Sequence, residues 1–279
     1  MTYLETSLSP YQENLEAQVN NLGYQLEYFL ETPTTMDVID EYLMKGRTSP
    51  LVALTEHQNR GIGRDNRVWH DQAGCSVMFS TNKKIRPDLV AILADLAALK
   101  TCLAVQGVTG IELKLKYPND FVVDGEKTGG ILVRNCYQAR IYRGTNIGIG
   151  KNVHYLKSDL EGYSQDPNYP VTALDLHTEK PNSRQDILIA ILQGLRYIDS
   201  SAQIFSTNNQ RRQDLNQVWQ SQSCVLGRTV AISIPERDLI RGKVVSTEIG
   251  KGIQIEIAGG LSIRWFNQFD TKMKVRLLD

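Results

Sequence analysis

The sequence has little of what marks metal-binding, disulfide-linked or membrane-spanning proteins. Its 279 residues include four histidines and four cysteines, and the cysteines never form C-x-x-C. Neither a zinc ribbon nor a dense disulfide frame is therefore indicated. The histidines make no H-x-x-x-H or H-E-x-x-H pair, so we expect no metal site built from protein side chains. No apolar run approaches the roughly 20 residues that span a bilayer, so we expect no membrane association.

An excess of charge of either sign is also absent. Lys plus Arg and Asp plus Glu balance at 31 each, so a chain-wide basic surface for nucleic acid is not expected. The opening stretch "MTYLETSLSPYQENLEAQV" has neither a basic n-region nor an apolar h-region, and it contains several acids. It therefore resembles neither a signal nor a transit peptide, and a cytoplasmic location is the default expectation.

The composition is ordinary for a globular protein, with 41% apolar and 22% charged residues, and the length is comfortable for two domains. Thr34 or Thr35 as N-cap and Gly46 as stop favour a short helix in "TTMDVIDEYLMKG". The stretches "SPLVAL" and "CSVMFS" have the character of short buried strands. "RPDLVAILADLAALKTCLAVQG" predicts a long helix that closes at Gly107.

Further strands are predicted in the middle of the chain. "IELKLKYP" alternates as a strand does, and "DFVVDGEKTGGILVR" predicts two strands joined by a turn at Asp124 and Gly125. "ARIYRGTNIGIGKNVHY" is either a strand pair or one long strand, and "KSDLEGYSQDPNYP" is a polar loop. Two more helices are expected, one capped by Ser183 and one over "QRRQDLNQVWQS".

The character of the sequence changes after Ser223. From there it is rich in Val and Ile, with turn glycines at short intervals and no helical period. This pattern predicts a small all-β barrel or sandwich. We therefore expect two domains, at residues 1–222 and 223–279.

A glycine-rich loop lies in "HQNRGIGRDNRVWHDQAGCSVMFS", which starts at His57. It is not a dinucleotide-binding fingerprint, because Asn66 stands at the third glycine and no helix pattern follows Trp69. Arg64 and Arg67 could hold phosphate or carboxylate oxygens in a bidentate manner. The alternative is a solvated basic loop, because the arginines stand among the acidic residues Glu56, Asp65 and Asp71.

Three more stretches could carry chemistry. "KYPND" forms a rigid turn after a strand. Lys127 precedes two glycines at the start of an apolar strand, where a surface lysine with a buried stem is equally common. In "IGIGKNV", glycines allow backbone to approach a ligand and Asn152 supplies an amide.

The four stretches together are far more specific than each alone. G-x-G-R-x-x-R-x-W, K-[WY]-P-N-D, K-x-x-G-I-L-V and G-I-G-x-N-V follow one another in this order. From about Tyr28 to Val153 the chain resembles the biotin protein ligase family, and the tail resembles the small SH3-like domain of such ligases. The resemblance implies an α+β fold: a mixed β-sheet catalytic domain with flanking helices, of the class II synthetase-like biotin/lipoate ligase type, followed by a small C-terminal SH3-like β-barrel.

The resemblance also implies an activity. Such ligases form biotinyl-5′-AMP and pyrophosphate from biotin and ATP, with Mg²⁺ carried by the phosphates. They then pass biotin to a lysine of the biotin carboxyl carrier domain of acetyl-CoA carboxylase or a related carboxylase. Some members repress transcription through an N-terminal winged helix. Only about 25 residues precede the pattern here, too few for such a domain, so we expect a monofunctional ligase without DNA binding. Family members are often dimers, so a homodimer is possible.

The resemblance assigns roles by position. The implied catalytic residues are Lys127, Arg64, Arg67 and Asp120. The implied biotin-binding residues are Thr34, Thr35, Gln58, Gly61, Ile62, Gly63, Arg64, Lys127, Gly129 and Gly130. The implied ATP- and adenylate-binding residues are Arg64, Arg67, Trp69, Asn119, Lys127 and Asn152.

Four positions depart from the family pattern. Met36 stands where asparagine is usual, Ile62 where arginine is frequent, Tyr117 for tryptophan and Lys151 for an apolar residue. Two alternatives stay open. One is a lipoate or octanoate ligase or transferase of the same fold. The other is a non-catalytic protein that binds biotin or a carrier domain, and Met36 is its best support.

Overall fold

The structure is a computed structural model that describes residues 10–164, 169–235, 238–257, 263–266 and 273–278. Its larger part is a seven-stranded sheet in the order β1-β2-β3-β7-β6-β5-β4. The first pair, β1 with β2, is parallel and the other neighbours are antiparallel, which confirms the mixed sheet. The strands are β1 (Gln25–Thr32), β2 (Leu51–Gln58), β3 (Ser76–Lys83), β4 (Lys114–Lys116), β5 (Asp120–Val123), β6 (Glu126–Gln138) and β7 (Ile141–Asn152).

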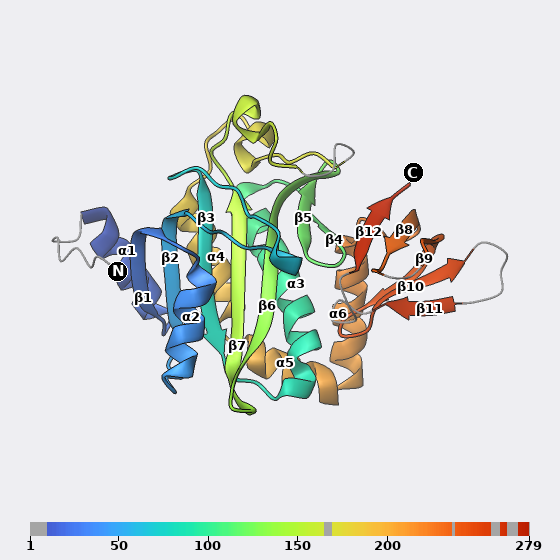
Figure 1. The fold of residues 1–279 in the computed structure, drawn as a ribbon, viewed down its shortest axis with the longest axis horizontal. Helices are drawn as coiled ribbons and strands as arrows, with labels where there is room; N and C mark the ends of the chain where they lie inside the picture. The colour runs from blue at the N-terminus through green and yellow to red at the C-terminus, as the bar shows by residue number, and fades with distance from the viewer. Residues whose placement is uncertain (1–9, 165–168, 236–237, 258–262, 267–272, 279) are drawn as a thin grey trace.

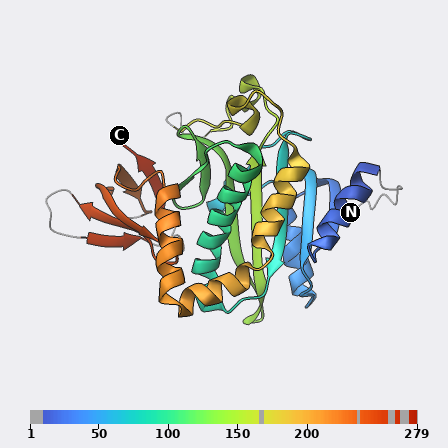
Figure 2. The ribbon, with the colours of Figure 1, turned by 180° about the vertical axis from the view of Figure 1, so that it is seen from behind.

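Helices cover the two faces of this sheet unequally. The helices α3 (Val90–Thr109) and α4 (Arg184–Leu195) lie across the back of the sheet, and α5 (Ile198–Thr207) lies at its lower end (Figure 2). From there α6 (Asn209–Gln222) rises upright toward the C-terminal strands. On the front lies α2 (Thr35–Met44), and α1 (Pro10–Asn21) lies beside the edge strand β1 (Figure 1). The helix α2 contacts β2, β3 and β7 and, less extensively, β6, where its Asp40 pairs with Arg134.

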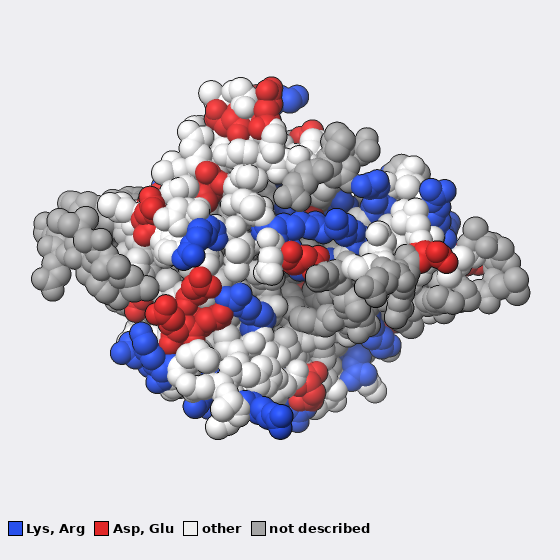
Figure 3. Space-filling model, in the orientation of Figure 1, with Lys and Arg blue, Asp and Glu red and all other residues white. Residues whose placement is uncertain are grey.

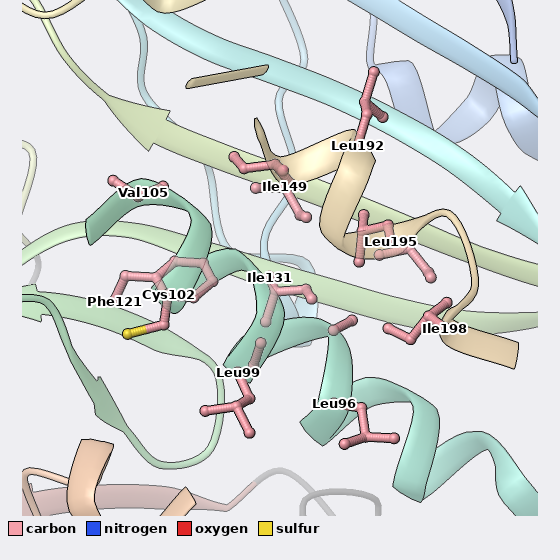
Figure 4. Packing of buried hydrophobic residues seen from close by; sticks show 14 of the residues in the cluster. Leu96, Leu99, Cys102, Val105, Phe121, Ile131, Ile149, Leu192, Leu195 and Ile198 are labelled. Atoms are coloured by element: carbon pink, nitrogen blue, oxygen red, sulfur yellow. The ribbon is translucent and has the colours of Figure 1, made fainter. Parts of the chain in front are cut away.

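The main core lies between the sheet and the back helices. Leu96, Leu99 and Cys102 of α3 pack toward Ile131 of β6 and Ile149 of β7, with residues of α4 beside them (Figure 4). α3 is apolar around most of its circumference, which is typical of a helix buried between two layers.

A second sheet follows α6. It is antiparallel, in the order β11-β10-β9-β8-β12, and has its own core, which includes Val230, Val244 and Ile253. Its strands are β8 (Thr229–Ser233), β9 (Ile240–Glu248), β10 (Gly252–Ile257), β11 (Ile263–Phe266) and β12 (Lys274–Leu277). The expectation of a small β region is confirmed. The division into domains at residue 222 stays a prediction. Tyr117, from the turn between β4 and β5, packs in the second core.

Local signals placed most elements correctly. Thr34 caps α2, Ser183 caps α4, and Asp124 and Gly125 form the β5–β6 turn with φ of 50° and 82°. The stretch from Ile141 forms one long strand instead of a pair.

Two expectations about helices need correction. The helix α3 does not close at Gly107 but continues to Thr109, where Gly110 with a φ of 71° provides the left-handed cap. The pattern also missed α1, β1 and α5, and the polar loop contains a short 3₁₀ turn at Lys157–Leu160. Among the described helices, none combines the length and apolar composition that crossing a bilayer needs.

Candidate active site

A cavity of about 290 Å³ opens on the front of the sheet beside α2. Its walls come from the start of α2, the glycine-rich loop, the β4–β5 turn, the strands β6 and β7, residues 163, 164, 169 and 171, and the strand β12. Lys and Arg atoms gather over the middle of this face (Figure 3). The sequence-predicted residues that line the cavity are Thr34, Thr35, Gln58, Ile62, Gly63, Arg64, Arg67, Trp69, Asn119, Asp120, Lys127 and Gly130.

The glycine-rich loop folds back on itself. Trp69 N donates to Gly61 O at 2.9 Å, and Gly63 N donates to Arg67 O at 2.7 Å. Between them Asp65 and its neighbour have φ of 59° and 57°, a left-handed turn that Asp and Asn tolerate. Because of this turn, Arg67 Nη2 lies 3.6 Å from Asp65 Oδ2, and both Arg64 and Arg67 line the cavity.

The indole of Trp69 lies directly against the backbone of β7. A methyl group on Gly150 would lie 2.6 Å from the ring, and one on Gly61 would lie 2.7 Å from Trp69 O. Both positions therefore need glycine because the ring and its backbone occupy the side-chain space. Gly61 itself does not line the cavity, so its place in the site is to seat Trp69.

Lys127 faces the same cavity from β6. Its Nζ lies 2.7 Å from Asp120 Oδ1 and 5.9 Å from the centre of the Trp69 ring. Its backbone bonds to the segment 170–172, through Lys127 N to Pro170 O at 2.8 Å. The carboxylate holds the ammonium at the cavity wall, so the side chain is positioned before any ligand binds.

Arg64 reaches from the loop to the second sheet. Its Nη2 donates to Met273 O, while Nη1 is buried and has no hydrogen-bond partner among the described residues. Burial lowers the pKa of Arg64. Lys274 and Arg276 of β12 also line the cavity, a contribution that the sequence did not reveal because it depends on how the second sheet packs.

One end of the cavity is lined by a row of polar groups. Thr35 N donates to Gln58 Oε1 at 2.9 Å, and Thr35 Oγ1 lies 2.7 Å from Ser80 Oγ. Among the described residues, the amide nitrogen of Gln58 has only the weak acceptor Met78 Sδ, at 3.6 Å. A ligand carbonyl would be a better acceptor for this amide. Ser80 was missed, because a serine within an apolar strand carries no signal of its own.

Besides Gly61, two predicted site residues do not line the cavity. Asn152 is buried, and its Nδ2 donates to Thr172 O at 3.1 Å. Gly129 faces its strand neighbour, since a methyl group there would lie 2.4 Å from Gly150 O. Asn119 does line the cavity, but its Nδ2 donates to Ile131 O at 3.1 Å. The binding roles of these three residues stay predictions. The contacts that they make in the structure are with the backbone of neighbouring segments.

Besides Lys274 and Arg276, a further cation at the cavity was missed. Lys116 Nζ lies 3.1 Å from the centre of the Tyr169 ring, and both residues line the cavity near Asp120. Burial, followed by the charge of Asp120, raises the pKa of Tyr169, which keeps this phenol neutral. Lys116 is the first residue of the K-Y-P-N-D motif, so the motif included it. Nothing in the sequence indicated that its side chain points into the cavity.

Known proteins are similar to the part of the chain that carries this cavity. Residues 28–152 match the model of the Biotin/lipoate A/B protein ligase family, so this segment is a domain of that family. The matched range contains every residue predicted for the site. It ends before the second sheet.

Relatives with established names match parts of the chain. The chain is 31% identical over 143 residues to the bifunctional ligase/repressor BirA of Bacillus subtilis, covering 50% of this chain and 43% of that protein. It is 33% identical over 109 residues to the chloroplastic biotin–protein ligase 1 of Arabidopsis thaliana, covering 37% of this chain and 29% of that protein. A biotin–[acetyl-CoA-carboxylase] ligase of Mycobacterium tuberculosis is 26% identical over 218 residues, covering 76% and 75%. The chain thus spans less than half of the first two relatives.

Solved structures share the fold over most of the chain. A biotin protein ligase from Aquifex aeolicus in complex with biotin and ATP has a TM-score of 0.71 at 21% identity, covering 90% of this chain and 98% of that one. One from Leishmania major in complex with biotinyl-5-AMP has a TM-score of 0.57 at 19% identity, covering 87% and 98%. These likenesses establish the fold.

Proposed function

We propose that the protein is an ATP-dependent biotin ligase. It would form biotinyl-5′-AMP and transfer biotin to a lysine of the biotin carboxyl carrier domain of acetyl-CoA carboxylase or a related carboxylase. The observation that carries the proposal is the convergence of Arg64 and Lys127, from separate segments, on one cavity. The family match over residues 28–152 supports it.

The first step needs positive charge at the attacked phosphate. A biotin carboxylate oxygen attacks the α-phosphorus of ATP, the bond from that phosphorus to the bridging oxygen breaks, and pyrophosphate leaves. Lys127 would offset the negative charge between the carboxylate and the phosphate oxygens, and Arg64 and Arg67 would hold the phosphate. The buried, unpaired Nη1 of Arg64 has a donor available for such an oxygen.

The second step needs a neutral amine. The ε-amine of the carrier lysine attacks the acyl carbon, the bond from that carbon to the phosphate oxygen breaks, and AMP leaves. The amine loses a proton in the process, and Asp120 is a carboxylate that lines the cavity and could accept it. Asp120 becomes available when Lys127, now 2.7 Å away, turns to the phosphate. Trp69 and the folded loop would exclude water from the mixed anhydride.

Mg²⁺ would enter with ATP. Among the residues that the structure describes, no group of three or more His, Cys, Asp and Glu side chains could hold a metal ion. This fits an ion that takes most of its oxygen ligands from phosphates and water. Asp120 is the carboxylate at the cavity that such an ion could meet. A cytoplasmic location, where ATP and the carrier meet, belongs to the same proposal.

The direct test is transfer to a carrier. The protein is incubated with ATP, Mg²⁺, biotin and an apo-carrier domain, and the carrier is weighed by mass spectrometry. We expect the mass to rise by one biotinyl group only when ATP is present. A carrier that keeps its mass contradicts the proposal. A parallel incubation with lipoate separates biotin from lipoate transfer, and biotin binding without ATP–pyrophosphate exchange would indicate a non-catalytic binding protein.

A second test addresses Arg64. Arg64→Gly should release the adenylate about 10- to 100-fold faster, because the loss of a charge-assisted hydrogen bond costs roughly 1.5–3 kcal/mol. Arg86→Gly is the matched control, since Arg86 is an exposed arginine that pairs with Asp88 and does not line the cavity. Equal rates of adenylate release from Arg64→Gly and Arg86→Gly would refute the role of Arg64 in holding the adenylate.

A further inference from the structure

Met36 closes the polar end of the cavity. It is the second residue of α2, it lines the cavity, and only 3% of its surface is exposed. It stands beside Thr35, whose hydroxyl and amide belong to the polar row with Gln58 and Ser80. A thioether at this place can pack against a ligand, but it donates no hydrogen bond.

The backbone of Met36 is fixed from two sides. Its N donates to Thr34 Oγ1 at 3.3 Å, the N-cap bond of α2, and its O accepts from Asn146 Nδ2 at 2.8 Å. Asn146 is itself held by Asp40 Oδ1 at 2.7 Å. The starting point of the Met36 side chain is therefore set by the helix cap on one side and by β7 on the other.

The sulfur of Met36 occupies the side-chain space of Gly148. A methyl group on Gly148 would lie 2.4 Å from Met36 Sδ and 3.2 Å from Ser80 Oγ. Because Gly148 has an ordinary φ, its backbone does not require glycine. The close approach of the thioether is what requires it. Met36 and Gly148 thus form a complementary pair on the cavity wall.

We propose that Met36, seated on Gly148, determines which ligand head group the cavity accepts. This inference rests on the proposed function and adds the basis of its specificity. The head group that fits has one edge with a hydrogen-bonding carbonyl and N–H groups for the row of Thr35, Gln58 and Ser80. The edge that meets Met36 is apolar and small. A cyclic urea fused to a thioether ring, as in biotin, has both edges, whereas a polar atom added to the apolar edge would be buried against sulfur without a partner.

The closing experiment measures ligand affinity without ATP, by calorimetry, for four proteins. They are the wild type, Gly148→Ala, Met36→Ala and the double variant. In Gly148→Ala the added methyl pushes the thioether into the cavity, and we expect biotin to bind at least about 10-fold more weakly. In the double variant the methyl takes the space that the thioether left, and we expect affinity within about 3-fold of Met36→Ala. Gly107→Ala, in open space on α3, is the control for a glycine substitution as such.

The same proteins are then tested with biotin sulfone, which adds polar oxygens to the ring sulfur. We expect the dissociation constant of biotin sulfone, divided by that of biotin, to fall at least about 5-fold in Met36→Ala. The space opened there lets water reach the added oxygens.

Two results would overturn the inference: Gly148→Ala that binds biotin as the wild type does, or a sulfone-to-biotin ratio that Met36→Ala leaves unchanged. A wild type that binds no biotin would instead contradict the proposed function, and this inference with it.

Discussion

The two faces of the strand β7 show how one segment serves a core and a cavity. Ile147 and Ile149 pack into the main core beneath the back helices. Their neighbours Gly148 and Gly150 lie against Met36 and Trp69 on the front. Because successive side chains of a strand point to opposite faces, glycine at alternate positions clears one face without weakening packing on the other. Gly148 and Gly150 line the cavity, and Met36 and Trp69 take the space that side chains at these two positions would need.

Two lysines sharpen this comparison. Lys127 on β6 faces the cavity and pairs with Asp120. Lys151 on β7 is fully buried on the core side, where its Nζ donates to Thr128 Oγ1 and lies 4.9 Å from the centre of the Phe121 ring. Burial lowers the pKa of Lys151 to about 7. The lysine on β6 therefore faces the cavity, whereas the lysine on the neighbouring strand β7 is buried in the core, where its charged form is unfavourable.

The largest effect is expected from Lys127→Met. Removing the cavity-facing charge should slow adenylate formation about 10²- to 10³-fold, as the loss of a positioned charge-stabilising donor does. ATP–pyrophosphate exchange measures this step. Lys151→Met is the matched control, with a lysine removed from the other face, and exchange should stay within about 3-fold of the wild type. An equal loss of exchange activity in both variants would contradict the inference that the cavity-facing lysine acts in the reaction and the core-facing lysine does not.

Lys151→Met should in turn have the larger effect on stability. The pKa of Lys151 is lowered from 10.5 to about 7 in the folded protein, so the unfolded chain binds more protons between these two values. The lysine therefore destabilises the fold fully below about pH 7, and less as the pH rises toward 10.5. Replacing it should raise the free energy of unfolding at pH 7 by on the order of 3 kcal/mol.

This stability difference is measured by urea unfolding at pH 7, 8 and 9. The gap between the wild type and Lys151→Met should narrow as the pH rises. A gap that is constant with pH would mean that Lys151 does not titrate in this range.

A smaller effect is expected from Gly150→Ala. The methyl group would meet the Trp69 ring at 2.6 Å and displace it from the cavity wall. We expect ATP to bind about 10-fold more weakly, a loss of roughly 1.4 kcal/mol, while the fold is kept. Nucleotide titration followed by tryptophan fluorescence reports affinity and ring movement together. An unmoved ring with unchanged affinity would show that the loop adapts.

The smallest effect is expected from Gly107→Ala, on the exposed side of α3. Nothing lies within 4 Å of an added methyl group, so the substitution removes only the conformational freedom of a glycine inside a helix. The free energy of unfolding should rise by about 0.5–1 kcal/mol, with exchange activity unchanged. Thermal unfolding measures the change, and a lowered midpoint would refute this view of the position.

Much of the site could be predicted because its motifs are local. The loop with Arg64, Arg67 and Trp69, and the strand that carries Lys127, are contiguous stretches whose order and spacing are visible in the sequence. The structure brings these two stretches to one cavity. Lys116 and Ser80 were missed, because a single polar residue in a strand does not indicate which face it occupies.

The sequence by itself determined the helix caps at Thr34 and Ser183, the turn at Asp124 and Gly125, and the β character of the tail. Each of these depends on neighbours along the chain, through hydrogen bonds and backbone preferences that span a few residues. Only the tertiary structure decided that Arg64 bonds to Met273, that Met36 fills the space beside Gly148, and that Lys151 points into the core. Those outcomes depend on which distant segment covers a given face, and the free energy of that packing is a property of the assembled layers.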